Sequence, residues 1–314
     1  MNIIKKMTPP RLRPGDTLGI AAPAGSSDPE NLRRGRAVLE SMGFRILLPR
    51  GLFEKKGYLA GSDAHRASVL MKLFADKSVR GIICARGGFG SMRLLSLLDF
   101  AMIRENPKIF VGFSDISALL SALYTKCGLG TFHGPVLTTL GDADRKTKEG
   151  MLSALSSDSG IEIKAEKGIA IRPGSASGPV AGGNLSTLCH LVGTAFAPEF
   201  RKHILFLEDT HEPAYKIDRM LTQMKFAGCF EEIAGLVLGT FENCGSPDDI
   251  FRIVNNIFRE NAVPVLAGLD AGHGSPNMTI PMGAEAMLDA DKHLLSYHKP
   301  PTAGLTDDES EMGK

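Results

Sequence analysis

The sequence predicts an α/β fold in which an N-terminal doubly wound parallel sheet is followed by a second, mixed α/β domain. In the first half, short apolar segments alternate with segments of helical periodicity, which is typical of parallel sheets. A charged and turn-rich stretch then interrupts this pattern, and 314 residues are enough to form two domains. We expect an N-terminal domain over residues 1–145, a linker over 146–178, and a C-terminal domain over 179–314 with a flexible tail from about residue 300.

The N-terminal half alternates strands and helices in the order that a parallel sheet requires. Asp28 followed by Pro29 is typical of a helix start, and Ser62 marks the start of a second helix. Ligands of such sheets bind at the carboxyl ends of the strands. The expected strands are 17–22, 44–48, 81–84 and 109–112.

The C-terminal half shows shorter strands with helices between them, which indicates a mixed α/β unit. The expected strands are 204–207, 235–241, 264–267 and 286–290, and the expected helices lie near 185–193, 215–227 and 248–260.

Composition limits the class of partner. The chain has 36 basic and 35 acidic residues, so no strong field attracts nucleic acid or an anionic membrane. We find neither a secretory signal at the N-terminus nor an apolar run of the roughly 18–20 residues that span a membrane. The five cysteines form no Cys-x-x-Cys pair, which favours buried, reduced thiols in a cytoplasm. No His-Glu-x-x-His motif is present, and we expect no metal and no cofactor.

The segment around Ser114 is the strongest candidate for chemistry. An apolar strand ends at Gly112, and a helix-like run begins at Ile116. A serine at such a strand-to-helix turn is held at the carboxyl edge of the sheet, where the N–H groups of the following helix point. The segment departs from Gly-x-Ser-x-Gly, since Ile116 occupies the place of the second glycine. The alternative is a helix N-cap after a buried strand.

Two later segments can supply the partners of a serine nucleophile. One is an apolar strand that ends in Glu208 and Asp209, and the other is His273 between two glycines. The order serine, carboxylate, histidine can provide a nucleophile, an orienting acid and a general base. Asp209 and Glu212 compete with Glu208 for the role of the acid, and His133 is the rival base.

A glycine loop over residues 87–90 follows the strand at 81–84. It lacks the spacing of a phosphate-binding loop, and a tight turn is the alternative. Arg86 precedes this loop. Its guanidinium suits a substrate carboxylate, although it could equally brace the loop.

Several segments, taken in order, carry a resemblance to a known family. The chain resembles the LD-carboxypeptidase (muramoyltetrapeptide carboxypeptidase) family of serine peptidases, which is related to the microcin-immunity carboxypeptidases. The resemblance runs from residue 11 to about residue 289, and Phe89 stands where the family more often has tyrosine. The segments that match are 21–24, 57–63, 85–90, 112–115, 133–135, 182–185, 203–221 and 268–274.

The resemblance implies roles for particular residues. It places the nucleophile on Ser114, the acid on Glu208 and the histidine on His273, with Gly88 and the N–H of Asp115 as the oxyanion hole. The serine and the histidine then belong to different domains, so the active site is expected in the crevice between them. The family implies a metal-independent serine carboxypeptidase that releases D-alanine from murein tetrapeptides in cell-wall recycling. It also implies a homodimer.

Two other functions stay open from the sequence. A microcin-immunity carboxypeptidase cleaves a peptidyl-adenylate, and that group uses a tryptophan in a long loop to stack the nucleotide. This chain contains no tryptophan. The other alternative is a non-enzymatic protein that holds a small anion at residues 87–90.

Overall fold

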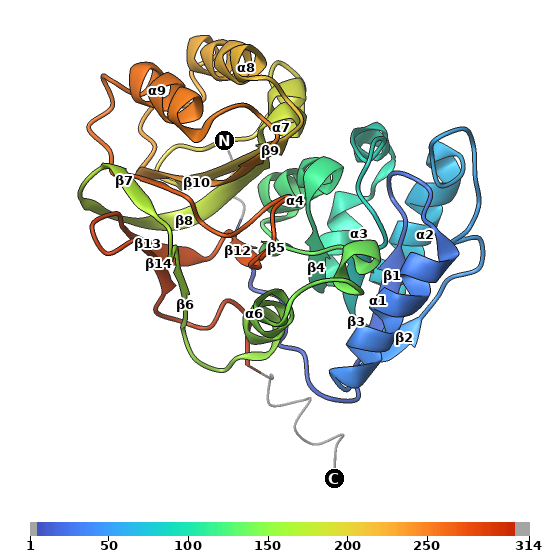
Figure 1. Cartoon of the computed structure of the whole chain (residues 1–314). Coiled ribbons are helices and arrows are strands. Elements are labelled where there is room, and N and C mark those ends of the chain that lie inside the picture. Colours follow the sequence, from blue (N-terminus) through green and yellow to red (C-terminus); the bar gives the residue numbers. More distant parts are fainter. Residues whose placement is uncertain (1–4, 305–314) are drawn as a thin grey trace.

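The computed structural model describes residues 5–304 and contains two β-sheets, each covered by helices (Figure 1). The predicted mixed α/β class with two domains is confirmed. Figure 1 shows the two sheets side by side, with α7, α8 and α9 together over one and α1 and α2 on the outer part of the other.

The first sheet has six strands in the order β12-β5-β4-β3-β1-β2. All neighbours are parallel except β12, which is antiparallel to β5. This order places the first βα crossover on one side of β1 and the later ones on the other, so the sheet is doubly wound as predicted. Its strands are β1 (Thr17–Ala21), β2 (Arg45–Leu47), β3 (Val79–Cys84), β4 (Ile109–Gly112), β5 (Thr131–His133) and β12 (Ile280–Met282).

Helices cover both faces of the first sheet. The predicted caps are observed: the Asp28 side chain accepts a hydrogen bond from the N–H of Asn31, and that of Ser62 accepts one from the N–H of His65. The α-helices of this half are α1 (Pro29–Ser41), α2 (Asp63–Ala75), α3 (Phe100–Glu105), α4 (Ser117–Ala122), α5 (Leu137–Leu140) and α6 (Arg145–Ser156). Tighter or wider helical turns are η1 (Met92–Leu97), η2 (Ser114–Ile116) and η3 (Leu123–Cys127).

The second sheet has eight strands in the order β6-β14-β13-β8-β9-β10-β11-β7. Its centre, β8 to β11, is parallel, and the outer strands are antiparallel. The consecutive strands β6 and β7 lie at opposite edges although only four residues join them, so the sheet must be rolled. The strands are β6 (Ile161–Lys164), β7 (Ile169–Arg172), β8 (Ser175–Asn184), β9 (Ile204–Thr210), β10 (Gly235–Glu242), β11 (Val265–Ala267), β13 (Glu285–Asp289) and β14 (Leu294–Tyr297). The helices are α7 (Leu185–Leu191), α8 (Ala214–Phe226) and α9 (Pro247–Ile257).

One hydrophobic cluster joins the two halves. Alternate residues of a strand point to opposite faces, so Leu205 and Leu207 of β9 pack under α7 to α9, while Phe206 points the other way. Phe206 belongs to the same buried cluster as Ile20 of β1 and Val111 of β4. The inner faces of both sheets therefore share a core, which holds their carboxyl edges in a fixed relation.

The chain between and after the expected domains is more ordered than the sequence suggested. Residues 146–178, expected as a linker, hold most of α6, all of β6 and β7, and the start of β8. The alternation of buried and exposed residues in β6 is that of a half-covered strand. Strand β12 lies within the expected C-terminal domain, yet it pairs with β5 of the first sheet.

The expected tail from about residue 300 begins as fixed structure. The N–H of Ala303 donates to the carbonyl of Pro9, and its carbonyl accepts from the N–H of Arg11. Thr302 is buried. Backbone pairing with the N-terminal segment thus orders residues that their composition alone marks as solvated. The rest of the expected tail, residues 305–314, lies outside the described residues.

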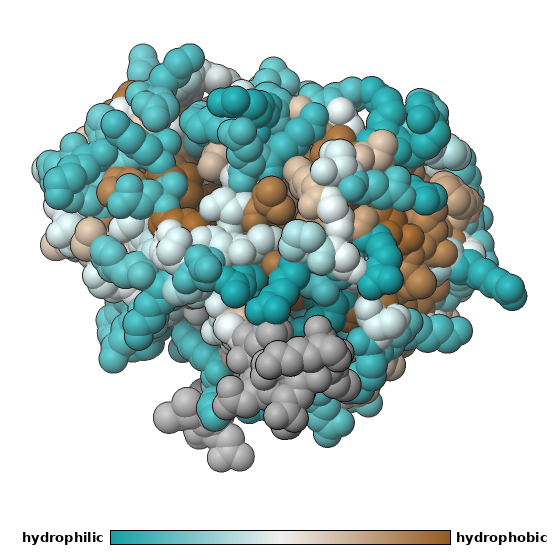
Figure 2. Space-filling view, turned by 90° about the horizontal axis from the view of Figure 1, so that it is seen from below, coloured by the Kyte–Doolittle hydropathy of each residue, from teal (hydrophilic) through white to brown (hydrophobic). Residues whose placement is uncertain are grey.

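All five cysteines are free thiols, and four of them are buried. Within residues 5–304, no helix is both long and apolar enough to cross a membrane. The face seen in Figure 2 is mainly hydrophilic, with hydrophobic residues in a few patches.

Candidate active site

The carboxyl ends of parallel strands from both sheets bring the predicted residues toward one region. Ser114 follows β4, and Glu208 lies in the last part of β9. His273 lies in the loop that follows β11. Glu208 and His273 meet because side chains that leave parallel strands of one sheet at their carboxyl ends gather at one edge, and the core shared by the two sheets brings the end of β4 toward that edge.

Ser114 has a strained backbone. Its φ is +63°, in the left-handed region that a residue with a Cβ rarely adopts. Such strain persists only where the surrounding structure enforces it, and it is concentrated at functional sites. The glycine loop presses against this turn: a Cβ on Gly87 would lie 3.0 Å from the Ser114 Cβ and 3.3 Å from its Oγ. A side chain at Gly87 would crowd the serine, and glycine avoids that contact.

Asp115 ties the serine turn to the glycine loop. Its buried carboxylate accepts a hydrogen bond of 2.8 Å from the N–H of Ser91, and its carbonyl accepts one from the Ser91 hydroxyl. Burial raises the pKa of Asp115, and the hydrogen bonds from Ser91 oppose that rise. Asp115 also lies in the first turn of η2, where backbone N–H groups have no partner within the helix.

Glu208 and His273 form a short hydrogen bond. The His273 Nδ1 lies 2.6 Å from Glu208 Oε2, and the backbone N–H of His273 donates to the same oxygen at 3.2 Å. The preceding residue, Gly272, has a φ of +114°, and a Cβ there would lie 2.5 Å from that oxygen. Glycine at this position is what allows the loop to approach the carboxylate.

The electrostatics of this pair match its geometry. Glu208 is completely buried, which by itself raises its pKa, but the interactions with His133 and His273 outweigh burial and bring the pKa to about 2. Burial lowers the pKa of His273, but the hydrogen bond to Glu208, together with the negative charges of Glu208, Asp209 and Glu242, outweighs burial, so the pKa of His273 is raised. A hydrogen bond from Nδ1 to the carboxylate leaves Nε2 as the proton acceptor.

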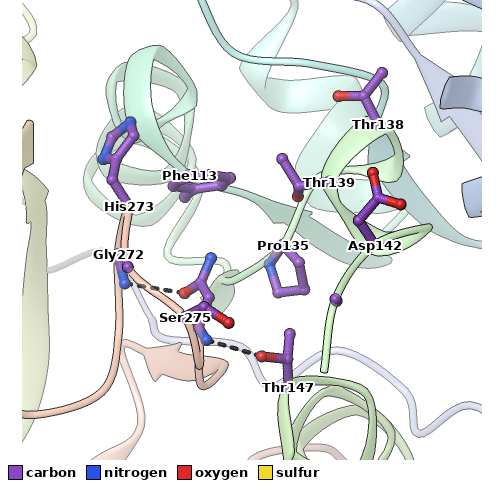
Figure 3. Close-up of a pocket in the computed structure, with 12 residues that line it drawn as sticks. Phe113, Pro135, Thr138, Thr139, Asp142, Thr147, Gly272, His273 and Ser275 are labelled. Carbon is purple, nitrogen blue, oxygen red and sulfur yellow. Dashed lines mark hydrogen bonds between the residues drawn. The ribbon is translucent and has the colours of Figure 1, made fainter. Parts of the chain in front are cut away.

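His273 also contacts the residue next to the serine. The ring centroids of His273 and Phe113 are 4.9 Å apart. Figure 3 shows these two rings together at one end of a cavity of about 300 Å³. Polar side chains such as Thr138 and Asp142 lie on its other side. The contact brings the imidazole from the second half of the chain to the serine turn of the first.

A larger cavity, of about 600 Å³, borders Ser114. Its walls come from the glycine loop, the serine turn, α7 and the end of β9. Gly88 and Asp115, the two predicted oxyanion donors, both line it. The other residues around it are Phe89, Met92, Arg93, Asn184, Ser186, Thr187, His190, Asp209, Thr210 and Glu212.

The two rival acids are engaged elsewhere. Asp209 accepts hydrogen bonds from Asn184 and from both the N–H and the hydroxyl of Ser186. Glu212 pairs with Lys216 at 3.2 Å. Asp209 and Glu212 both line the cavity, but the carboxylate that hydrogen-bonds to His273 is that of Glu208.

Arg86 is placed differently from the other predicted residues. Its exposed guanidinium donates to the Ser26 carbonyl at 2.9 Å. Among the described residues that line the larger cavity, Arg86 is absent. The observed contact of Arg86 is therefore one that braces the glycine loop, through the Ser26 carbonyl. Within residues 5–304 no cluster of three or more histidine, cysteine, aspartate or glutamate side chains is arranged to hold a metal ion.

His133 is a neighbour of Glu208, whereas the sequence indicates it only as a rival base. His133 lies 3.7 Å from Glu208, measured from Nε2 to Oε1. The His-Gly-Pro segment after an apolar strand was the available signal, but nothing local to it points to a carboxylate 75 residues further along the chain.

Known protein families match almost the same regions that form the two sheets. Residues 18–134 match the LD-carboxypeptidase N-terminal domain, and residues 177–288 match the LD-carboxypeptidase C-terminal domain. The chain belongs to the LD-carboxypeptidase family. The family predicted from the sequence is thus confirmed, and membership makes the chain a serine-type carboxypeptidase, a hydrolase.

Individual members of the LD-carboxypeptidase family are similar over nearly their whole length. The probable murein peptide carboxypeptidase of Bacillus subtilis is 37% identical over 290 residues, covering 90% of this chain and 91% of that protein. A solved MccF-like protein from Bacillus anthracis has a TM-score of 0.88 at 29% identity, covering 93% of this chain and 99% of its own. The muramoyltetrapeptide carboxypeptidase from Oxalobacter formigenes has a TM-score of 0.79 at 29% identity, covering 89% and 97%.

Proposed function

We propose that this protein is a serine LD-carboxypeptidase that removes the C-terminal D-alanine from murein tetrapeptides in cell-wall recycling. The observation that carries the proposal is the 2.6 Å hydrogen bond between Glu208 and His273, held against the strained turn of Ser114. The names of relatives that act on murein peptides support the substrate class.

The proposed reaction uses three side chains. Ser114 Oγ attacks the carbonyl that joins an L-centre to the terminal D-alanine, and its proton moves to Nε2 of His273. Glu208 holds the imidazole in the required tautomer and stabilises the imidazolium that forms. His273 then gives the proton to the departing amine of D-alanine, which leaves an ester on Ser114. Water, deprotonated by His273, attacks that ester, and His273 returns the proton to Ser114 Oγ as the shortened peptide leaves.

The oxyanion of each tetrahedral intermediate needs donors that are already in place. We assign this role to the backbone N–H groups of Gly88 and Asp115, which border the same cavity as Ser114. Loss of one such donor typically costs about 3–4 kcal/mol of transition-state stabilisation. Arg86 lies outside this cavity and donates to the Ser26 carbonyl, and we propose that its remaining guanidinium donors contact the substrate carboxylate from the exposed side of the loop. Exchange of Arg86 for lysine should then raise KM.

The domain division is also a proposal. Residues 1–145 form the nucleophile domain, and residues 179–314 carry the acid and the histidine, with 146–178 crossing between them. The separate family matches over 18–134 and 177–288 support this division.

We propose a cytoplasmic homodimer; four buried free thiols support a reducing compartment. The dimer is inferred from the family resemblance.

The test is mass spectrometry of a muropeptide mixture before and after incubation. The wild-type protein should remove one alanine from the tetrapeptide and leave tripeptide and pentapeptide unchanged. The Ser114→Ala protein, matched in concentration, should leave all three unchanged. A wild-type protein that is folded and leaves the tetrapeptide intact contradicts the proposal.

The second candidate is cleavage of a peptidyl-adenylate, which the TM-score of 0.88 to the MccF-like protein favours. The same incubation with a peptidyl-nucleotide substrate separates the two: faster turnover of that substrate than of the tetrapeptide supports the immunity function. A non-enzymatic anion-binding protein would cleave neither.

A further inference from the structure

His133 is a buried histidine without a hydrogen bond. It ends β5, is 0% exposed, and neither of its ring nitrogens has a hydrogen-bond partner within residues 5–304. The polar atom that faces it is Glu208 Oε1, at 3.7 Å from Nε2. That oxygen is also buried and without a hydrogen-bond partner among the described residues.

The surroundings of His133 connect the two halves of the active site. β5 pairs with β4, and His133 lies opposite Gly112, two residues before Ser114. Its ring contacts Phe113 on the nucleophile turn, with centroids 6.0 Å apart, and Phe206 of β9, at 5.0 Å. His133 therefore lies on the first sheet while it faces the acid of the second.

Leaving both groups unpaired is costly. A buried polar group without a partner gives up its hydrogen bonds to water without replacing them, and a charged group loses more. A shift of about 0.7 Å brings Nε2 to the ~3.0 Å of an ordinary N–H···O bond. Oε2 of Glu208 already accepts from His273, so His133 is the group placed to serve the remaining oxygen.

We propose that His133 is a positioning residue: its Nε2–H serves Glu208 Oε1 and fixes the acid of one sheet against the strand that carries the nucleophile of the other. This inference rests on the proposed function, because it assigns Glu208 the role of the catalytic acid. The low pKa of Glu208, to which His133 contributes, agrees with it.

Several other titratable groups surround the pair. Glu208 is faced by His133 from β5, by His273 from the loop after β11, and by Asp209 from its own strand. The charge of Glu208 contributes to the raised pKa of Cys244, which follows β10, and the charge of Glu242, at the end of β10, contributes to the raised pKa of His273. Of these groups, His273 hydrogen-bonds to Glu208 at 2.6 Å, and His133 lies 3.7 Å from its other oxygen.

Removal of the donor has a defined sign. Without His133, the Glu208 carboxylate has one hydrogen-bond donor fewer, so it is a stronger base than in the wild type and attracts the His273 proton more strongly. The pKa of His273 should then rise. The acidic limb of kcat/KM, which reports the loss of a proton from the catalytic base in the free enzyme, should move to higher pH. Loss of orientation should also lower kcat by about 10–100-fold, by analogy with the partners that orient metal ligands.

The experiment compares three variants with the wild type on murein tetrapeptide. His133→Phe keeps a ring of similar size without a donor, and His133→Gln keeps a donor. His203→Phe removes a half-buried histidine that instead contacts Tyr124 at 2.9 Å. We expect His133→Phe to lower kcat with little change in KM and to shift the acidic limb upward. His133→Gln should recover most of both, and His203→Phe should change neither.

Wild-type kcat and pH profile in His133→Phe, or equal losses in His133→Gln and His133→Phe, would overturn the proposal. A measurement without substrate decides the matter even where His133→Phe fails to fold or the wild type leaves the tetrapeptide intact. Nitrogen-15 NMR of wild-type histidines should show the His133 proton on Nε2, and a proton on Nδ1 contradicts the assignment. Inactivity of the wild type would count against the proposed function alone.

Discussion

Exchange of Glu208 for glutamine removes a charge and keeps the shape of the side chain. Glu208 is completely buried, yet the two histidines bring its pKa from the usual 4.5 to about 2. That difference corresponds to about 3 kcal/mol in the free energy of unfolding where the partners are protonated. Because the folded pKa is lowered, the contribution is present above pH 4.5 and is lost as the pH falls toward 2.

The titration of His273 sets the upper limit of the pH range in which the pair is most stabilising. The pKa of His273 is raised above 6.5, so the stability from its protonated form is present below pH 6.5 and is lost as the pH rises through the folded value. The stability difference between wild type and Glu208→Gln should therefore be largest between about pH 4.5 and 6.5. It should decline on both sides of that window.

Urea unfolding over a series of pH values measures this difference directly. The matched control is Glu212→Gln, which breaks the partly exposed pair with Lys216 and should cost less than about 1 kcal/mol.

In turnover assays, Glu208→Gln should lower kcat by about 10³–10⁴-fold with little change in KM. Adding His273→Ala to it should cost scarcely more than His273→Ala alone, because the pair acts as a unit. A stability difference that is absent, or constant from pH 2 to 8, refutes the reasoning, as does a kcat loss in Glu212→Gln that Glu208→Gln lacks.

Three further outcomes follow from the same site. Ser114→Ala should unfold at nearly the wild-type urea concentration and lose several orders of magnitude in turnover; retention of more than a tenth of the activity excludes it as the nucleophile. Gly272→Ala places a Cβ 2.5 Å from Glu208 Oε2 at a φ of +114°. It should lower the free energy of unfolding by about 1–3 kcal/mol and reduce kcat, and an unchanged melting temperature would show that the loop is not held as described. EDTA should leave the rate unchanged, since the proposed nucleophile, base and acid act without a metal; loss restored by added zinc would contradict the serine mechanism.

The strands β1 to β4, β9 to β11 and β13 could be predicted from the sequence because each carries a continuous apolar run, whereas β5 to β8, β12 and β14 were not predicted. The strand before Ser114 and the caps at Asp28 and Ser62 depend on neighbouring residues only. β12 could not be predicted in the same way. It has three residues, and its partner β5 is distant in the chain. Its membership in the first sheet arises from tertiary packing.

The site shows the same limit. Motifs and the family resemblance predict Ser114, Glu208 and His273 as the site residues, in that order along the chain. The strained φ of Ser114 and the approach of His133 to Glu208 depend on how two sheets share one core, which no local pattern encodes. Arg86 illustrates the converse: its residue type suits a carboxylate, but the nearby Ser26 carbonyl is the partner that the fold supplies.

The most direct test of the catalytic account is covalent labelling with a fluorophosphonate, which reacts with an activated serine. Wild-type protein should take up one label, and peptide mapping should place it on Ser114. His273→Ala should label far more slowly, and Ser114→Ala should not be labelled. Stoichiometric labelling of another serine, or an active wild-type enzyme that resists the reagent, would contradict the assignment of Ser114 as the nucleophile.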